Sequence, residues 1–350
     1  MADENTELHI YDRDLNFKGI IDIFISLRWR RKYFEAGEFE LHLQATANNI
    51  KLFKKDNIII REDSEEAGII NSVEIEEGEN STQLVVLGRF LSYLLYRRIV
   101  QSRINFTGTY LAGMRKLLAE MTPFNILEID PTIIPSETVT FQCTYKNVYN
   151  HINKLSLACG IGFKIVPDIL RKKLVFGNFI GIDRTSEQKV NPFYEFSENY
   201  SNIEKANYLV DSSTLCNYVL VGGEGEGTSR FMVTIDNTAG LHDFDIVEKF
   251  VDAKSETKGD LTNPQYTEVL REKGNEYIKA ITESINYDVY VDDYKLKWNL
   301  GDIVTVKKES WGISENLRIT EVEEVIEGST QKITPTFGIP LAERFVEDDS

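Results

Sequence analysis

Residues 27–33 read LRWRRKY, and after a turn at 35–37 the segment 38–43 reads EFELHL. In both segments apolar residues alternate with charged or polar ones, which is the two-residue period of a β-strand that buries one face. The alternation predicts two half-buried strands and sets the β character of the first part of the chain.

Strand-like segments continue on both sides of this stretch, with turn residues between them. They are 8–12, 17–25, 58–60, 68–70, 73–76 and 83–88. Thr46 is placed to cap a short helix that interrupts them. Strands this short, with turn signals every ~8–12 residues, are typical of a small β-barrel or sandwich.

Residues 91–181 have a different pattern. Apolar stripes at helical spacing predict one helix over 109–121 and a second over 147–158, which Gly160 is expected to end. The segments 163–166 and 173–176 are expected to pair as a hairpin. The pattern predicts a small α/β module.

The β character returns from about residue 190. The strand-like segments here are 217–221, 231–235, 289–298, 302–307, 317–324 and 331–336. One helix interrupts them, with Asn263 as its expected cap and Pro264 at its first position.

These patterns together predict an α+β, mainly β fold that begins with a small barrel or sandwich, continues with an α/β module and ends with a second β region that one helix interrupts. The expected domains are 1–95 (first β-barrel-like domain), 96–185 (α/β module), 186–345 (second β-barrel-like domain with a helix at 264–283) and 346–350 (a frayed tail).

Composition excludes several classes of function. The chain has 350 residues and a formal net charge of -17, so most of its surface should repel phosphate backbones and no specific nucleic-acid binding is expected. Cys143, Cys159 and Cys216 are odd in number and widely spaced, which indicates reduced thiols. No apolar run reaches the ~20 residues that span a bilayer, and the acidic N-terminus differs from a secretory signal, so we expect synthesis in a cytoplasm.

No motif indicates catalysis, a metal or a cofactor. The glycine run 222–227 follows a strand but precedes another strand-like segment, and Glu224 and Glu226 within it would repel phosphate, so a hairpin tip is favoured over a phosphate loop. The segment 242–245 (HDFD) is favoured as a solvated loop over a metal site. Asp292 and Asp293 lack the remainder of a calcium loop.

The basic and aromatic segment at 28–33 stands out in an acidic chain. It is either a docking face for an acidic surface, including the protein's own surface in an oligomer, or a strand face that simply carries charges. The basic pair at 97–98 has the same two interpretations, and the glycine-rich loop is a candidate contact loop. The candidate interface residues are Arg28, Trp29, Arg30, Arg31, Tyr33, Arg97, Arg98, Glu224, Glu226 and Arg230.

The order of several segments resembles the baseplate hub, or tail-tip hub, family of bacteriophage tails. This family includes siphovirus and prophage hub proteins and those of contractile tail-like bacteriocins. The segments that carry the resemblance are 11–17 (YDRDLNF), 27–33 (LRWRRKY), 34–41 (FEAGEFEL), 88–90 (GRF) with 94–99, 217–219 with 222–225 and Arg230, 300–304 (LGDIV), 319–322 (ITEV) and 336–338 (TFG).

The resemblance implies a tail-hub type of fold, mainly β, with two small barrel-like β domains, an α/β module and a connecting helix. It also implies a homotrimer in which two similar barrels per subunit present six similar faces. These faces would fit a hexameric tail tube on one side, while the trimer would fit a trimeric spike or tail tip on the other. The tape measure and baseplate wedge proteins are further candidate partners. Some longer members carry a C-terminal cell-wall enzyme, for which this chain leaves no room after residue 338. The implied function is structural and not enzymatic, in a virion tail or tail-like particle.

Two alternatives belong to other functional classes. One is a tail-associated cell-wall hydrolase, since 56 acidic residues offer many carboxylate pairs without specifying one. The other is a carbohydrate- or receptor-binding tail module in which Trp29, Trp298 or Trp311 would stack on sugars, although core packing also explains them.

Overall fold

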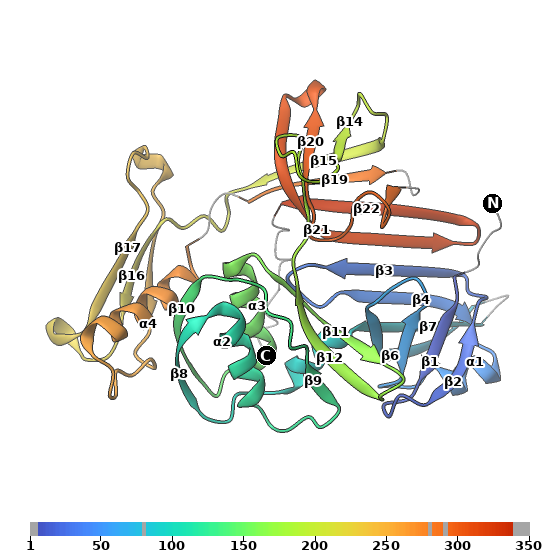
Figure 1. The fold of residues 1–350 in the computed structure, drawn as a ribbon, viewed down its shortest axis with the longest axis horizontal. Coiled ribbons are helices and arrows are strands. Elements are labelled where there is room, and N and C mark those ends of the chain that lie inside the picture. Colours follow the sequence, from blue (N-terminus) through green and yellow to red (C-terminus); the bar gives the residue numbers. More distant parts are fainter. Residues whose placement is uncertain (1–5, 79–81, 279–281, 290–292, 339–350) are drawn as a thin grey trace.

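The computed structural model describes residues 6–78, 82–278, 282–289 and 293–338 (Figure 1). Strands make up 45% of the structure and helices 18%, which confirms the mainly β prediction. The largest element is a 14-stranded sheet whose main path runs β15-β19-β22-β21-β3-β4-β7-β6-β5-β1-β2. This one sheet contains strands from both the N-terminal and the C-terminal part of the chain.

The first β domain supplies seven strands of that sheet. They are β1 (Leu8–Tyr11), β2 (Phe17–Ile21), β3 (Ser26–Lys32), β4 (Glu38–Gln44), β5 (Ile58–Arg61), β6 (Ala67–Glu77) and β7 (Thr82–Phe90). Helix α1 (Ala47–Leu52) begins as predicted, because the Thr46 side chain accepts a hydrogen bond from the Asn49 amide at 3.2 Å. Trp29, Phe39 and Phe90 pack together in the core.

The α/β module follows. Its elements are the 3₁₀-helix η1 (Leu91–Arg97), β8 (Arg103–Thr109), α2 (Tyr110–Ala119), β9 (Leu127–Ile129), β10 (Thr138–Thr144), α3 (Val148–Cys159), β11 (Gly162–Asp168) and β12 (Lys173–Phe179). Both helices and the β11–β12 hairpin match the sequence prediction, and Gly160 ends α3 with φ 69. The core of this module also contains Ile58 and Ile69, so it continues the first β domain.

The second β domain contains β13 (Asp183–Arg184), β14 (Glu195–Ser197), β15 (Ile203–Asp211), β19 (Thr282–Val289), β20 (Ile303–Lys308), β21 (Ile313–Glu327) and β22 (Thr330–Gly338). Phe196, Trp298 and Phe337 are central to its core. The strand predicted at 289–298 was misplaced: the strand ends at Val289, and Tyr294 and Trp298 belong to the turn that follows.

Residues between β15 and β19 form a separate small unit, seen at the left of Figure 1. It consists of β16 (Tyr218–Gly222), β17 (Met232–Asp236), β18 (Glu248–Asp252) and α4 (Asn263–Asn275), with a core of its own. The range 186–345 therefore contains two cores.

The helix predicted at 264–283 differs at both ends. Thr262, and not Asn263, is the N-cap, because its side chain and that of Gln265 form a capping box. The helix ends at Asn275, since its buried stripe covers only the three-stranded sheet and the chain must then return as β19 to pair with β15. Residues 279–281 of the predicted helix and the tail 346–350 lie outside the described residues.

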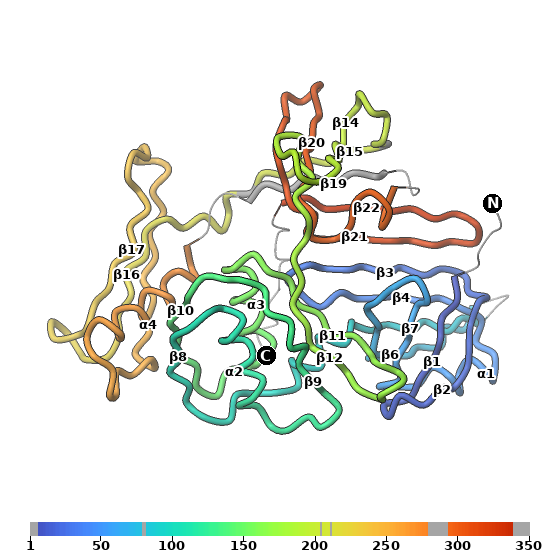
Figure 2. The backbone as a smooth tube through the Cα atoms, in the orientation of Figure 1, coloured from blue at the N-terminus to red at the C-terminus, as the bar shows by residue number. Residues whose placement is uncertain are grey.

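Four strands in each half of the large sheet share one topology (Figure 2). The first four-strand unit is β6-β7-β4-β3, and the second four-strand unit is β21-β22-β19-β15. In both, the spatial order is third, fourth, second and first strand along the chain, and all neighbours are antiparallel. The sheet is thus an internal repeat whose halves follow one another head to tail.

Burial of one histidine predicts a pH dependence of stability. His151 of α3 lies against the Phe141 ring, with centroids 4.9 Å apart, and burial lowers its pKa to about 4. The unfolded chain takes up this proton near pH 6.5 while the folded chain resists it. Stability should therefore be lost as pH falls from about 6.5 toward 4.

We expect His151→Phe to remove this contribution, up to about 3 kcal/mol at pH 4. Urea unfolding at pH 7 and pH 4.5 measures it. Protonation of carboxylates lowers the stability of both proteins equally at acidic pH. Between pH 7 and pH 4.5 the variant should therefore lose less stability than the wild type. Equal losses would contradict the assignment.

Candidate functional site at the β3–β21 junction

The two four-strand units meet where β3 pairs with β21. The pairing is antiparallel and runs from Ser26 opposite Glu327 to Lys32 opposite Glu321. Beyond its end, the Tyr33 amide donates to the Thr320 carbonyl at 2.9 Å. This ladder joins strands about 290 residues apart in sequence, and it makes one sheet of the two β domains (Figure 1).

Charged side chains form a ladder on one face of the junction. Arg30 lies directly opposite Glu323, and its Nη2 is 2.6 Å from that carboxylate. Arg28 Nε donates to the same Glu323 oxygen at 2.6 Å, and Arg30 also pairs with Glu38 and with Glu321. Burial opposes the charge of Arg30, but these carboxylates raise its pKa above the ordinary value. Opposite charges across a strand pair favour this register.

Aromatic side chains occupy the other face of β3. Trp29 is fully buried, with its ring centroid 4.6 Å from that of Phe90. Tyr33 is also buried, and its hydroxyl lies 3.2 Å from the carbonyl oxygens of Gly160 and Phe179. β3 is therefore tied to the second β domain by pairing and to the α/β module by Tyr33.

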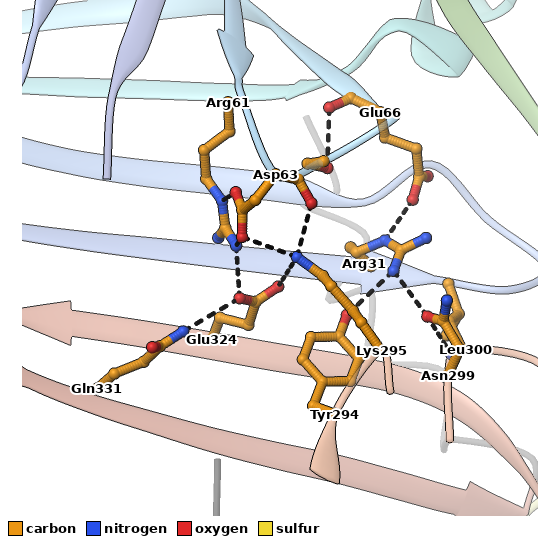
Figure 3. A network of polar contacts seen from close by, with 11 residues as sticks. Arg31, Arg61, Asp63, Glu66, Tyr294, Lys295, Asn299, Leu300, Glu324 and Gln331 are labelled. Atoms are coloured by element: carbon orange, nitrogen blue, oxygen red, sulfur yellow. Dashed lines mark hydrogen bonds and ion pairs between the residues drawn. The ribbon is translucent and has the colours of Figure 1, made fainter. Parts of the chain in front are cut away.

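A buried ion pair connects β3 with the turn before β6 (Figure 3). Arg31 Nε donates to Glu66 Oε2 at 2.6 Å, and its Nη1 donates to Tyr294 Oη and Asn299 Oδ1, each at 3.0 Å. Burial works against the charged form of Arg31, but Tyr294 and Glu66 raise its pKa. Burial also raises the pKa of Tyr294, so its hydroxyl stays protonated.

A second buried pair crosses between the two β domains directly. Arg61 at the end of β5 donates through Nη2 to Glu324 Oε2 of β21 at 2.6 Å, and both residues are almost fully buried. Asp63 binds the same guanidinium and also accepts from Lys295 Nζ at 2.9 Å (Figure 3). Burial would raise the pKa of Asp63, yet Arg61 and Lys295 lower it overall.

The ion pairs and hydrogen bonds of the junction hold the two β domains together. Its arginines are paired with carboxylates, which balances their charge and fixes their positions. Within the described part of the chain, no group of three or more His, Cys, Asp or Glu side chains could hold a metal ion. None of the helices described is long and apolar enough to cross a membrane.

The predicted interface residues of β3 do come together, but the acidic surface they bind belongs to the same chain. Trp29, Arg31 and Tyr33 are buried and offer no surface to another protein, which corrects their assignment as contact residues. The reason is that β21, distant in sequence, covers β3. Arg28 remains partly exposed, and its contact with a partner stays a prediction.

The other candidate interface residues lie elsewhere. Arg97 pairs with Asp56 at 2.8 Å, and the Arg98 guanidinium lies over the Phe124 ring at 5.0 Å. Neither belongs to the junction, and their role as contacts stays untested.

The glycine-rich segment is the predicted hairpin loop, between β16 and β17. Arg230 closes it by donating to the carbonyl oxygens of Gly223 at 3.0 Å and Gly222 at 2.7 Å, and a Cβ on Gly222 would lie 2.6 Å from the guanidinium carbon. Glu224 accepts from the Lys258 amide, and Glu226 pairs with Lys254. These residues are far from the junction in Figure 1 and stay candidate contacts.

Sequence reasoning missed the buried half of the junction. The missed residues are Arg61, Asp63, Glu66, Tyr294, Lys295 and Glu324. Arg61 directly follows the apolar run 58–60, and a charge that ends such a strand is a usable signal of a buried ion pair. The partner, Glu324, gives no such signal among its acidic neighbours.

We expect Arg61→Met to destabilise the protein by about 3–5 kcal/mol, because it leaves the Glu324 carboxylate buried without its main partner. Adding Glu324→Leu should recover much of this loss. Arg28→Ala, at a half-exposed pair, is the control and should cost less than about 1 kcal/mol. Urea unfolding of the four proteins gives the values. Equal effects of Arg61→Met and Arg28→Ala would contradict the assignment.

Three solved structures share this fold over nearly the whole length of both chains. The prophage tail protein gp18 from Listeria monocytogenes is 15% identical with a TM-score of 0.55, covering 95% of this chain and 94% of that one. The 43 kDa tail protein of prophage MuSo2 from Shewanella oneidensis is 13% identical, with a TM-score of 0.60 and coverages of 95% and 98%. A tail protein from Neisseria meningitidis is 14% identical, with a TM-score of 0.60 and coverages of 96% and 97%.

These likenesses confirm the predicted tail-protein type of fold. No curated protein sequence matches the chain. A family model described as siphovirus ReqiPepy6 Gp37-like protein matches residues 7–339. The chain therefore belongs to the siphovirus ReqiPepy6 Gp37-like protein family and has the fold of prophage tail proteins.

Proposed function

We propose that this chain is the baseplate hub of a phage or phage-like tail. Three copies form a ring that adapts a hexameric tail tube on one side to a trimeric spike or tail tip on the other. The observation that carries the proposal is the internal repeat, in which two four-strand units of one topology lie in a continuous sheet.

The repeat supports this role through symmetry. Each copy offers two similar β surfaces, so three copies offer six, and a six-fold partner can then contact a three-fold ring with matched surfaces. The junction supports it mechanically, because buried ion pairs and a strand ladder hold the two units at a fixed angle. The proposed location is the tail, after synthesis in the host cytoplasm, with the tape measure and baseplate wedge proteins as additional neighbours.

The full chain at about 100 µM should have the mass of a trimer by light scattering, and should bind purified tail tube protein of the same particle. Negative-stain images of that complex should show a three-fold ring on the end of a tube. A chain that stays monomeric at this concentration and does not bind the tube would overturn the hub proposal.

We further propose that the chain acts without catalysis. For the carbohydrate-binding alternative, Trp29 and Trp298 are buried and cannot stack on a sugar, which leaves Trp311 as the candidate. Trp311 is 47% exposed, and Lys308 Nζ lies 5.5 Å from its ring centroid. Incubation with purified cell walls should release no soluble fragments, and measurable release would favour the hydrolase.

A further inference from the structure

The turn that joins β11 to β12 presents a leucine to solvent. Leu170 is 98% exposed, more than any other large apolar side chain of the described residues, and Arg171, Lys172 and Lys173 follow it. Such turns usually carry small polar residues, and Lys172 has φ 51, in the left-handed region that favours glycine. A turn that departs from local preferences in this way is a candidate contact.

This turn is held in one conformation by its neighbours. The Asp168 carboxylate accepts from the Arg171 amide at 2.9 Å and from Arg171 Nε at 2.7 Å. Ile169 packs against the core of the α/β module. Leu170 is therefore presented from a rigid support, and a contact made through it needs little further ordering of the chain.

A second turn lies beside the first, as the tips of the β1–β2 and β11–β12 hairpins show in Figure 1. Lys172 Nζ donates to Asn16 Oδ1, in the turn between β1 and β2. That turn also carries Arg13, and Lys18 follows it in β2; both are exposed. We call the resulting surface the basic tip. Its residues are Arg13, Lys18, Leu170, Arg171, Lys172 and Lys173.

Ion pairs leave the basic tip with an excess of positive charge. Glu128 lies between Arg171 and Lys173, at 2.6 and 3.7 Å. Lys172 bonds to a neutral amide, and neither it nor Arg13 has a carboxylate partner among the described residues. The chain as a whole has a formal net charge of -17. Unneutralised cations beside an exposed leucine therefore indicate an anionic partner.

The positive surface continues into the α/β module. Lys173 Nζ donates to the Asn125 carbonyl at 2.9 Å. The ring of the adjacent Phe124 lies under the Arg98 guanidinium, 5.0 Å away. A series of direct contacts thus connects Arg98 with the basic tip and widens the surface that an anionic partner would meet.

We propose that the basic tip binds the surface of an anionic phospholipid bilayer, with Leu170 entering the headgroup region and the cations contacting lipid phosphates. Peripheral binding of this kind combines apolar burial with electrostatic attraction. A bilayer needs no shaped cavity, whereas a protein partner would need an acidic pocket fitted to a protruding leucine. Membrane binding goes beyond the proposed hub role and requires neither the ring nor a tail tube.

The acidic remainder of the surface does not prevent this contact at moderate salt. The Debye length is about 8 Å at ~0.15 M salt, so acidic side chains farther than this from the bilayer are screened, while the cations of the tip touch the headgroups. At ~0.5 M salt the attraction of these cations is itself screened, and binding should weaken.

Vesicle flotation of the full chain tests the proposal. At ~0.15 M salt we expect the chain to float with vesicles made of equal parts phosphatidylglycerol and phosphatidylcholine, and to stay unbound with vesicles of phosphatidylcholine alone. Equal binding to both vesicles would overturn the proposal. Failure to bind the anionic vesicles would also overturn it and would favour a protein as the partner of the tip.

Leu170→Ser tests the apolar part of the contact. It should weaken binding to the anionic vesicles about five-fold, because burial of the leucine is lost. Phe244→Ser is the matched control, since Phe244 is 93% exposed but stands between Asp243 and Asp245, and this variant should bind as the wild type does. Equal losses in the two variants would contradict the role of Leu170.

Charge reversal tests the electrostatic part. Lys172→Glu and Arg13→Glu should each weaken binding at least about five-fold. Lys254→Glu is the control, because the Lys254 side chain is 56% exposed in the separate small unit and should not reach the bilayer. All three positions are exposed, so urea unfolding should be nearly unchanged. A similar loss with Lys254→Glu would show that net charge alone governs binding, and would overturn the assignment to the basic tip.

Discussion

The pairing of β3 with β21 is the interaction on which the rest of the structure depends. It converts two β domains, formed by opposite ends of the chain, into one continuous sheet. The charged ladder on one face and the Trp29 and Tyr33 packing on the other both require the same register. A slip by one residue would move Arg30 into the core face and Trp29 into solvent.

Buried charge gives this junction its specificity. A buried ion pair is a poor source of net stability, because desolvation offsets its attraction. Its value here is that Arg61 has one geometry that satisfies Glu324, and Arg31 has one that satisfies Glu66 and Tyr294. An apolar contact of the same size would tolerate neighbouring registers. The two domains are consequently held in one relative arrangement, which the proposed ring would require.

The other parts of the chain are arranged around this sheet. The α/β module shares its core with the first β domain and is anchored to β3 through Tyr33. The unit formed by β16, β17, β18 and α4 has its own core and projects away from the sheet (Figure 1). Its closed glycine-rich loop and exposed residues are separate from the junction.

The sequence by itself determined the local elements. Alternation in 27–33 and 38–43 predicted β3 and β4, the cap at Thr46 predicted α1, and apolar stripes at helical spacing predicted α2 and α3. These signals depend on neighbours within a few residues. For the basic segment of β3 the sequence left two interpretations open, a docking face for an acidic surface or a strand face that simply carries charges. Only the tertiary structure decided that the docking partner is β21 of the same chain, that Arg61 faces Glu324, and that the four-strand topology occurs twice. The pairing of strands that lie far apart in sequence depends on the whole core. One acidic strand among many has no local sequence feature that identifies its partner.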